Sequence, residues 1–260
     1  MTKIIEEVKN IEKQNMSIIG RLVEEISWAG QNVKKYRNGG VGYENVLTAE
    51  ILQALDLLPR KRYFAEIIRR SHGRLSKAKS ILIKEMEDAK ITFLPGNHYL
   101  KPSLNSHQKA LAVQPDAIIN TPKVFTLVEA KRLKTCYFMP QQLAREYVIA
   151  TRNCKARLPF LLLFLRKEPP IKVNGHGRMN IKENILLYLE EVIGFAENYP
   201  YSINDSIEMI DDVVSWITWG EIKDIVNEQL EIEKEYISLS NYNSFKRIVD
   251  NINYAINIHR

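Results

Sequence analysis

Residues 115–131 read Pro-Asp-Ala-Ile-Ile-Asn-Thr-Pro-Lys-Val-Phe-Thr-Leu-Val-Glu-Ala-Lys, and this stretch decides the fold. Two short apolar, β-prone runs, 116–119 and 124–128, lie on either side of the turn-forming residues 120–123. The pattern predicts an antiparallel hairpin. Its second strand ends in Glu129 and Lys131, opposite charges that a buried strand rarely carries unless they serve a site.

The segments around the hairpin complete an α/β pattern. Apolar residues recur at helical spacing over 43–58 and again over 139–152. The continuous apolar run 159–165 predicts a strand that is covered on both faces. We expect residues 167–180 to form a loop and the chain from 181 onward to be helical. Together these elements predict a mixed sheet flanked by helices.

The geometry of the hairpin brings acidic groups together. A four-residue loop at 120–123 would place Asp116 opposite Leu127. Asp116, Glu129 and Lys131 would then project from one face of the sheet, with the two acids as diagonal neighbours about 7–8 Å apart. Two carboxylates at that separation, together with the Ala130 carbonyl, could hold Mg²⁺ or Mn²⁺. Lys131 could then hold a water or neutralise charge on a phosphate.

Pro115-Asp116, twelve intervening residues and Glu129-Ala130-Lys131 together resemble the signature of the PD-(D/E)XK nuclease superfamily. The resemblance covers roughly residues 42–165 and includes the order helix, hairpin, helix, strand. It implies a restriction-endonuclease-like fold, with Asp116 and Glu129 as metal ligands and Lys131 as the catalytic lysine. The plain alternative is a buried structural ion pair beside a turn aspartate.

The resemblance also implies an acidic residue on the helix that precedes the hairpin. Glu44 is preferred, because its spacing from Leu47 and Ile51 puts it on the helix face that should point toward the sheet. Glu50 remains a second candidate for this role, although a solvated helix residue is the simpler interpretation of it.

Relatives in this superfamily often carry a glutamine at the start of the next helix, near the scissile phosphate or the lysine. Gln141 and Gln142 stand there, and we assign the role to Gln142. Ordinary helix-start residues are an equal alternative. One branch of the superfamily has a tyrosine four residues later, whereas here that position is Glu146 and Tyr147 follows it.

The charge of the chain points to a polyanionic partner. The net charge is +6, but residues 205–260 carry 5 Lys/Arg against 11 Asp/Glu, and residues 60–90 carry 10 against 4. A basic body suits nucleic acid, although a solvated helix face would look the same. The expected DNA-contacting residues are Arg69, Arg70, Arg74, Lys77, Arg132, Lys134 and Arg145.

The chain divides into three expected parts: a helical N-terminal segment 1–40, a nuclease core 41–170, and a helical C-terminal region 171–260 that could dimerise or clamp DNA. Two cysteines without a CxxC motif fit a reducing compartment such as the cytoplasm. No apolar run is long enough to cross a bilayer, and the first residues do not resemble a signal peptide. We therefore expect no membrane partner.

These features predict an Mg²⁺-dependent endonuclease that acts on double-stranded DNA. By its resemblance, a chain of this size is closest to a type II restriction endonuclease, which would act as a homodimer. The alternatives are a non-specific or structure-specific nuclease of antiphage defence or repair, an inactive DNA-binding relative, and an RNA nuclease.

Overall fold

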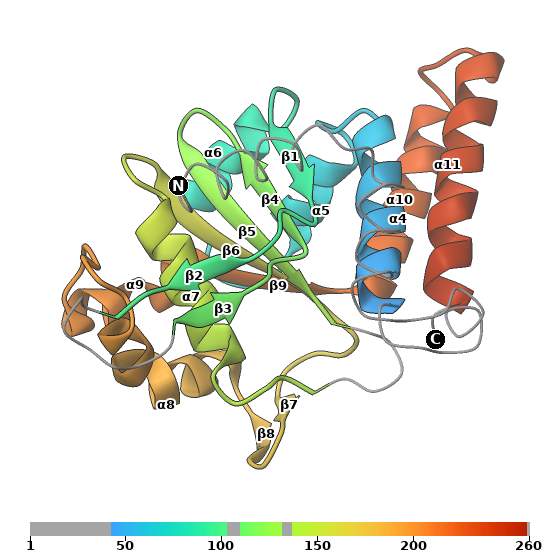
Figure 1. Cartoon of the computed structure of the whole chain (residues 1–260). Coiled ribbons are helices and arrows are strands. Elements are labelled where there is room, and N and C mark those ends of the chain that lie inside the picture. Colours follow the sequence, from blue (N-terminus) through green and yellow to red (C-terminus); the bar gives the residue numbers. More distant parts are fainter. Residues whose placement is uncertain (1–42, 103–109, 132–136, 259–260) are drawn as a thin grey trace, which may run out of the picture.

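A mixed five-stranded sheet forms the centre of the molecule (Figure 1). The computed structural model describes residues 43–102, 110–131 and 137–258. The strand order is β1-β4-β5-β6-β9; β1, β4 and β5 are antiparallel, and β5, β6 and β9 are parallel. The bounds are β1 (Lys90–Phe93), β4 (Ala117–Asn120), β5 (Val124–Ala130), β6 (Leu158–Leu165) and β9 (Val214–Thr218). The predicted α/β architecture with a helix-flanked mixed sheet is confirmed.

The predicted hairpin is formed by β4 and β5, but its register differs from the prediction. Leu127 pairs with Ile118 and not with Asp116. The turn begins one residue later than expected, because the Thr121 hydroxyl accepts a hydrogen bond from the Val124 N–H at 2.9 Å. Both strands shift by one residue, so every side chain keeps its predicted face of the sheet.

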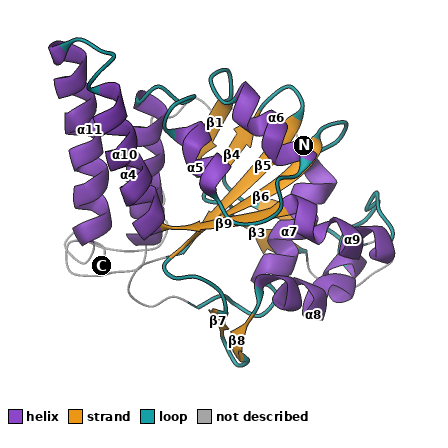
Figure 2. Cartoon of the chain, turned by 180° about the vertical axis from the view of Figure 1, so that it is seen from behind, coloured by secondary structure: helices purple, strands orange, loops and turns teal. Residues whose placement is uncertain are grey.

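Helices cover both faces of the sheet (Figure 2). On one face, a core that includes Val128, Ala130 and Phe164 packs against five helices. These are α4 (Tyr43–Leu57), α5 (Phe64–Arg70), α6 (Lys77–Glu85), α10 (Trp219–Glu233) and α11 (Leu239–Ile258). On the other face, Leu127 and Leu163 pack against α7 (Gln142–Asn153), α8 (Ile181–Gly194) and α9 (Ile203–Val213).

The alternation along β5 explains this division. Leu127 belongs to the core on the α7 face, whereas Val128 and Ala130 belong to the core on the opposite face. Glu129 therefore faces α7. The β6 run is buried on both faces, as its uninterrupted apolar sequence predicts.

Two sequence-based expectations for the C-terminal region were wrong. Residues 167–180 include a small hairpin, β7 (Ile171–Val173) and β8 (Gly177–Met179). The chain after Ile181 is not helical throughout, because β9 pairs in parallel with β6. Its β-branched residues suit a strand, and pairing with the buried β6 favours that structure over a helix. The region after residue 171 therefore supplies part of the central sheet.

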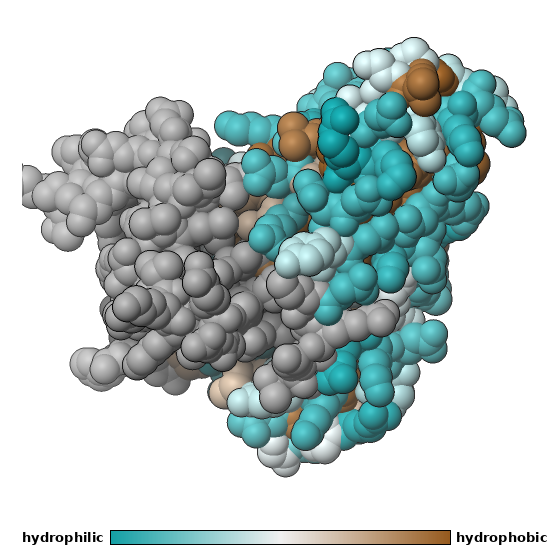
Figure 3. All heavy atoms as spheres, turned by 90° about the vertical axis from the view of Figure 1, so that its right-hand side faces the viewer, coloured by the Kyte–Doolittle hydropathy of each residue, from teal (hydrophilic) through white to brown (hydrophobic). Residues whose placement is uncertain are grey.

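Other features complete the fold. A second small pair, β2 (His98–Leu100) and β3 (Leu111–Val113), lies beside α7. The face presented by α11 is mostly hydrophilic in its described part, with apolar residues in small groups (Figure 3). Within the described ranges, none of the helices combines the length and the apolar character needed to span a membrane. The expected N-terminal segment 1–40 lies outside the described residues.

Candidate active site

The candidate site lies where β4 and β5 begin to separate. The strands remain paired as far as Ala117 and Val128, and one step further Asp116 lies across from Glu129. There the Ala130 N–H donates a 2.7 Å hydrogen bond to Oδ2 of Asp116. The two acids are thus direct cross-strand neighbours and not the diagonal ones that the sequence predicted. Both are almost completely buried.

Glu129 connects three parts of the site. Its Oε1 atom accepts a hydrogen bond from Nζ of Lys131 and another from Nε2 of Gln142, each at 2.6 Å. Charge-assisted hydrogen bonds of this kind are strong; Lys131 is buried here, whereas Gln142 is half-buried. The Glu129 carboxylate therefore fixes the lysine that follows β5 relative to the first residue of α7. Of the two glutamines considered from the sequence, Gln142 is the one that makes this contact.

Lys131 is held by its main chain as well as by its side chain. Its N–H donates to the Phe164 carbonyl at 2.8 Å, and its carbonyl accepts from Nε1 of Trp219 at 2.8 Å. The ammonium group lies 5.0 Å from the centre of the Phe138 ring, within the range of a cation–π contact. These contacts give the amine a defined position at the end of β5.

Glu146 is a further site residue that the sequence analysis did not identify. It lies one helical turn after Gln142, its side chain is 2% exposed, and Oε2 has no hydrogen-bond partner in the described structure. Burial raises the pKa of this carboxyl well above its usual value, and the negative charges of Glu129 and Asp116 add to that effect. Lys131 and a hydrogen bond with Gln142 act in the opposite direction.

A signal for Glu146 was present in the sequence. Residues four apart on a helix lie on the same face, so a glutamine that points at the site predicts that the residue four positions later does too. In the sequence, Glu146 was notable only because it occupies the position at which one branch of the superfamily has a tyrosine. The structure makes it the third carboxyl group of the cluster.

The chemistry of the cluster suits a small divalent cation. Its donors are carboxylate oxygens, which Mg²⁺ and Mn²⁺ prefer, and Glu146 contributes an oxygen with no partner of its own. The pKa of Glu146 is raised first by burial and then by the negative charges of Glu129 and Asp116, and a bound cation would offset those charges. Within the described ranges, no three His, Cys, Asp or Glu side chains are already arranged as a metal site. Asp116 and Glu129 therefore fit as two ligands, with water as the remainder.

A cavity of about 600 Å³ opens beside these residues, between β3 and α7. Gln142 and Glu146 line it together with Arg145, which was predicted to contact DNA. The Arg145 guanidinium donates to the Gln141 side chain, and burial lowers its pKa. Of the described residues expected to bind DNA, Arg145 is the one on the helix that carries Gln142 and Glu146.

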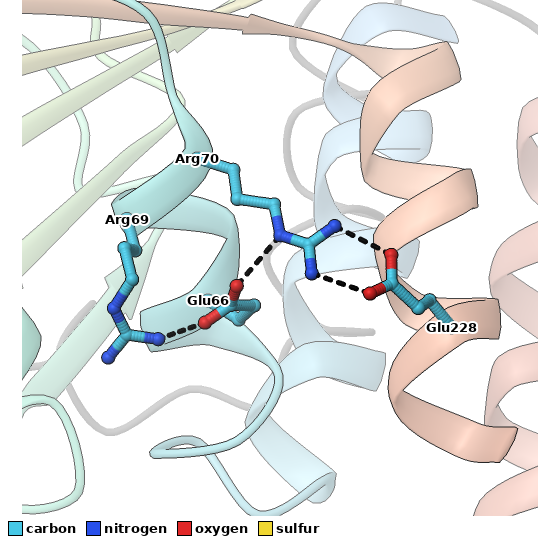
Figure 4. A network of polar contacts seen from close by, with 4 residues as sticks. All are labelled: Glu66, Arg69, Arg70 and Glu228. Carbon is cyan, nitrogen blue, oxygen red and sulfur yellow. Dashed lines mark hydrogen bonds and ion pairs between the residues drawn. The ribbon is translucent and has the colours of Figure 1, made fainter. Parts of the chain in front are cut away.

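Two other predicted DNA contacts lie on a helix that covers the opposite face of the sheet. Arg69 and Arg70 extend from α5, and both pair with Glu66 of the same helix. Arg70 also forms a two-bond contact with Glu228 of α10, at 2.6 and 2.7 Å (Figure 4). These guanidinium groups are thus paired with carboxylates of the chain itself.

The remaining predicted residues are dispersed. Arg74 pairs with Asp212 of α9 at 3.2 Å, and Lys77 is exposed at the start of α6. Arg132 and Lys134 lie outside the described residues, as does the side chain of Glu44 near the start of α4. Glu50 is exposed and lines a depression between α4 and α11, not the cavity beside Gln142.

Comparisons with protein-family models, with curated proteins and with solved structures give no match for this chain. The function proposed for this protein therefore rests on the geometry of the site and on the sequence resemblance.

Proposed function

We propose that this protein is a metal-dependent DNA endonuclease of the PD-(D/E)XK type with a restriction-endonuclease-like fold. The observation that carries the proposal is the shared contact of Lys131 and Gln142 with one oxygen of Glu129, directly across from Asp116. Two carboxylates, an amine and an amide from two strands and a helix are the groups that hydrolysis of a phosphodiester requires. An ordinary structural ion pair would not need the second acid or the Glu146 carboxyl, whose Oε2 atom has no hydrogen-bond partner in the described structure.

The side chains have separable roles in this proposal. Asp116 and Glu129 would hold Mg²⁺ or Mn²⁺, which when bound offsets charge on the phosphate and makes water more acidic. Lys131 places its positive charge where the phosphate oxygens gain negative charge, and Glu129 keeps the lysine there. Water attacks phosphorus, the bond to the 3′ oxygen breaks, that oxygen takes up a proton, and a 5′ phosphate remains. Gln142 positions Glu129 from the α7 side.

The form of the activity that we propose is type II restriction by a homodimer in the cytoplasm. Cutting both strands of a duplex requires two such sites, and a two-fold dimer supplies them. A buried free thiol at Cys154 agrees with a reducing compartment. A non-specific or structure-specific defence nuclease, an RNA nuclease and an inactive DNA-binding protein are the other outcomes that the following experiment separates.

The test is digestion of a defined plasmid, and of a matched RNA, with Mg²⁺ and then with Mn²⁺. We expect discrete DNA bands, whereas a smear would indicate non-specific cleavage. Asp116→Asn should abolish cleavage and leave DNA binding in place. Asp212→Asn, which changes an exposed carboxylate on α9, is the matched control and should cut normally. Wild-type protein that binds but never cuts, or an Asp116→Asn variant that cuts normally, would overturn the proposal.

A further inference from the structure

A basic cavity that the sequence did not predict lies between the end of β6 and the β7–β8 hairpin. It has a volume of about 210 Å³. Four cationic residues line it, Arg166, Lys167, Lys172 and Arg178, together with one acidic residue, Glu168. In Figure 1 the hairpin projects away from the body of the molecule, below the sheet. We refer to these five residues as the hairpin cluster.

The hairpin cluster is adjacent to the candidate active site. Phe138 lines its cavity, and Nζ of Lys131 lies 5.0 Å from the centre of the same ring. Two main-chain hydrogen bonds attach Phe138 to the hairpin. Its N–H donates to the Lys172 carbonyl, and its carbonyl accepts from the Asn174 N–H, each at 2.9 Å. A single aromatic ring therefore separates the cavity from the amine to which we assign catalysis.

Three charges of the hairpin cluster, those of Lys167, Lys172 and Arg178, are not neutralised within the described part of the protein. Lys172 and Arg178 are direct cross-strand partners in the β7–β8 register. Like charges directly opposite each other destabilise a strand pair. In the part of the chain that the structure describes, no carboxylate comes within 4 Å of the charged groups of Lys167, Lys172 or Arg178, and all three are exposed. The arrangement is unfavourable for the isolated hairpin but suits an anion that lies against it.

We propose that the hairpin cluster binds the phosphate backbone of duplex DNA next to the phosphate that is cut. This inference rests on the proposed nuclease function, because the position beside Lys131 is what identifies the anion as a neighbouring phosphate. Lysine and arginine contacts to phosphates supply most of the sequence-independent affinity for DNA, and they release counterions. The cluster would fix the path of the duplex across the ends of β5 and β6.

The test measures binding of a fluorescently labelled 20-base-pair duplex by anisotropy, in EDTA and over a range of NaCl concentrations. For the double variant Lys172→Ala/Arg178→Ala we expect the affinity for the duplex to fall about tenfold or more. The plot of log association constant against log salt concentration should become less steep by about 1.8, because each lost phosphate contact accounts for about 0.9. The control Arg69→Ala/Arg74→Ala removes the same charge from the α5–α6 region. Since both of its arginines are paired with carboxylates, its slope should match that of wild type.

Unchanged affinity and slope in the hairpin double variant would overturn the inference, and so would an equal loss in the control. Thermal unfolding checks that the variants fold. If the double variant fails to fold, Arg178→Gln alone should show about half the change in slope. Because binding is measured without metal, the two proposals can fail separately. A reduced slope in the double variant, with no cleavage of DNA by wild type in Mg²⁺, would support DNA binding by the hairpin cluster and refute the nuclease function. Normal cleavage by wild type with an unchanged slope in the double variant would support the nuclease function and refute DNA binding by the cluster.

Discussion

Two basic regions of this molecule differ in what their positive charges contact. In the α5–α6 region, Arg70 is paired with carboxylates from two helices, and Arg69 is paired within its own helix. In the β7–β8 hairpin, Lys172 faces Arg178, and neither has an acidic partner in the described structure. A high density of lysine and arginine in the sequence therefore does not identify a nucleic-acid surface. The distinguishing property is whether acidic residues from elsewhere in the fold neutralise the charge.

The acidic C-terminal region explains much of this difference. Asp212 contacts Arg74, and Glu228 contacts Arg70. The nearly buried Glu233 contacts Arg62 at 2.5 Å. The positive and negative parts of the sequence thus partly pair with each other inside one chain. Some of the acidic residues that we considered for a dimer contact serve to attach α9 and α10 to the basic segment.

The largest effect that we expect separates two buried lysines on opposite sides of the sheet. Lys131→Met should reduce the initial rate of plasmid cleavage by about 10³-fold, because the phosphate loses its nearby positive charge. Lys79→Met is the matched control. Lys79 is as buried as Lys131, but it lies on α6, where burial lowers its pKa and its amine donates to the Ser71 carbonyl. Normal cleavage by Lys131→Met, or equal loss in both variants, would contradict the assignment.

The sequence predicted the hairpin, and the face that carries Asp116 and Glu129, because both follow from local patterning. The register was wrong by one residue on each strand, since the turn geometry depends on the Thr121 side chain. That error left Asp116 and Glu129 on the same face, because side chains alternate with a period of two. The convergence of Asp116, Glu129 and Lys131 could therefore be expected from strand geometry, whereas that of Gln142 was implied by the family resemblance.

The features that the sequence did not reveal depend on contacts between distant residues. β9 follows a helix directly and is a strand because it pairs with β6. Two acidic partners of the α5–α6 region, Asp212 and Glu228, lie more than 130 positions away in the sequence. Spacing from Gln142 puts Glu146 on the same helix face, but its burial beside Glu129 and Asp116 depends on the packing of α7 against β5. No pattern along the chain shows that the β7–β8 hairpin will lie beside Lys131.

The second-largest effect that we expect is a loss of stability on changing Gly73, which tests whether the α5–α6 region is a fixed part of the fold. Gly73 has φ +110°, and an added Cβ would meet the Val214 carbonyl at 2.8 Å and Oγ of Ser215 at 2.9 Å. Gly73→Ala should lower the free energy of unfolding by about 2–3 kcal/mol in urea, through strain and displacement of β9. Gly96→Ala has φ +84° but no atom within 4 Å, so it measures the backbone strain alone. Equal losses in the two variants would indicate that the contact with β9 is unimportant.

A smaller effect should appear at the candidate site. In EDTA, Glu146→Gln should raise the free energy of unfolding at pH 7 by about 1–2 kcal/mol, because it removes a buried carboxyl whose charged form is disfavoured. Between the ordinary pKa and the raised one, folded wild type keeps a proton that the unfolded chain has released. Wild-type stability should therefore fall as pH rises through this window, by up to about 1.4 kcal/mol per pH unit, and the variant should not share that fall.

Urea unfolding at several pH values measures the difference between the two proteins. Glu190→Gln, at an exposed position on α8, is the control; because it keeps Glu146, its stability should vary with pH as that of wild type does. A Glu146→Gln variant that is less stable than wild type in EDTA would mean that the carboxyl supports the fold and is not crowded by Glu129 and Asp116.

The smallest effect concerns the exposed pair between α5 and α10. Glu228→Gln removes the charge and one of the two oxygens that Arg70 contacts, yet solvent and salt screen exposed ion pairs. The melting temperature should therefore change little, and the change should vanish at high salt. Duplex affinity should rise only slightly at low salt, because Arg70 keeps its pair with Glu66. Glu231→Gln on the same helix leaves the Arg70 pair intact and is the control. Glu228→Gln could instead steepen the salt dependence of DNA binding by a full phosphate contact. The α5–α6 arginines would then be a DNA-binding surface that Glu228 masks, and the two basic regions would differ in how DNA binding is regulated and not in whether they bind DNA.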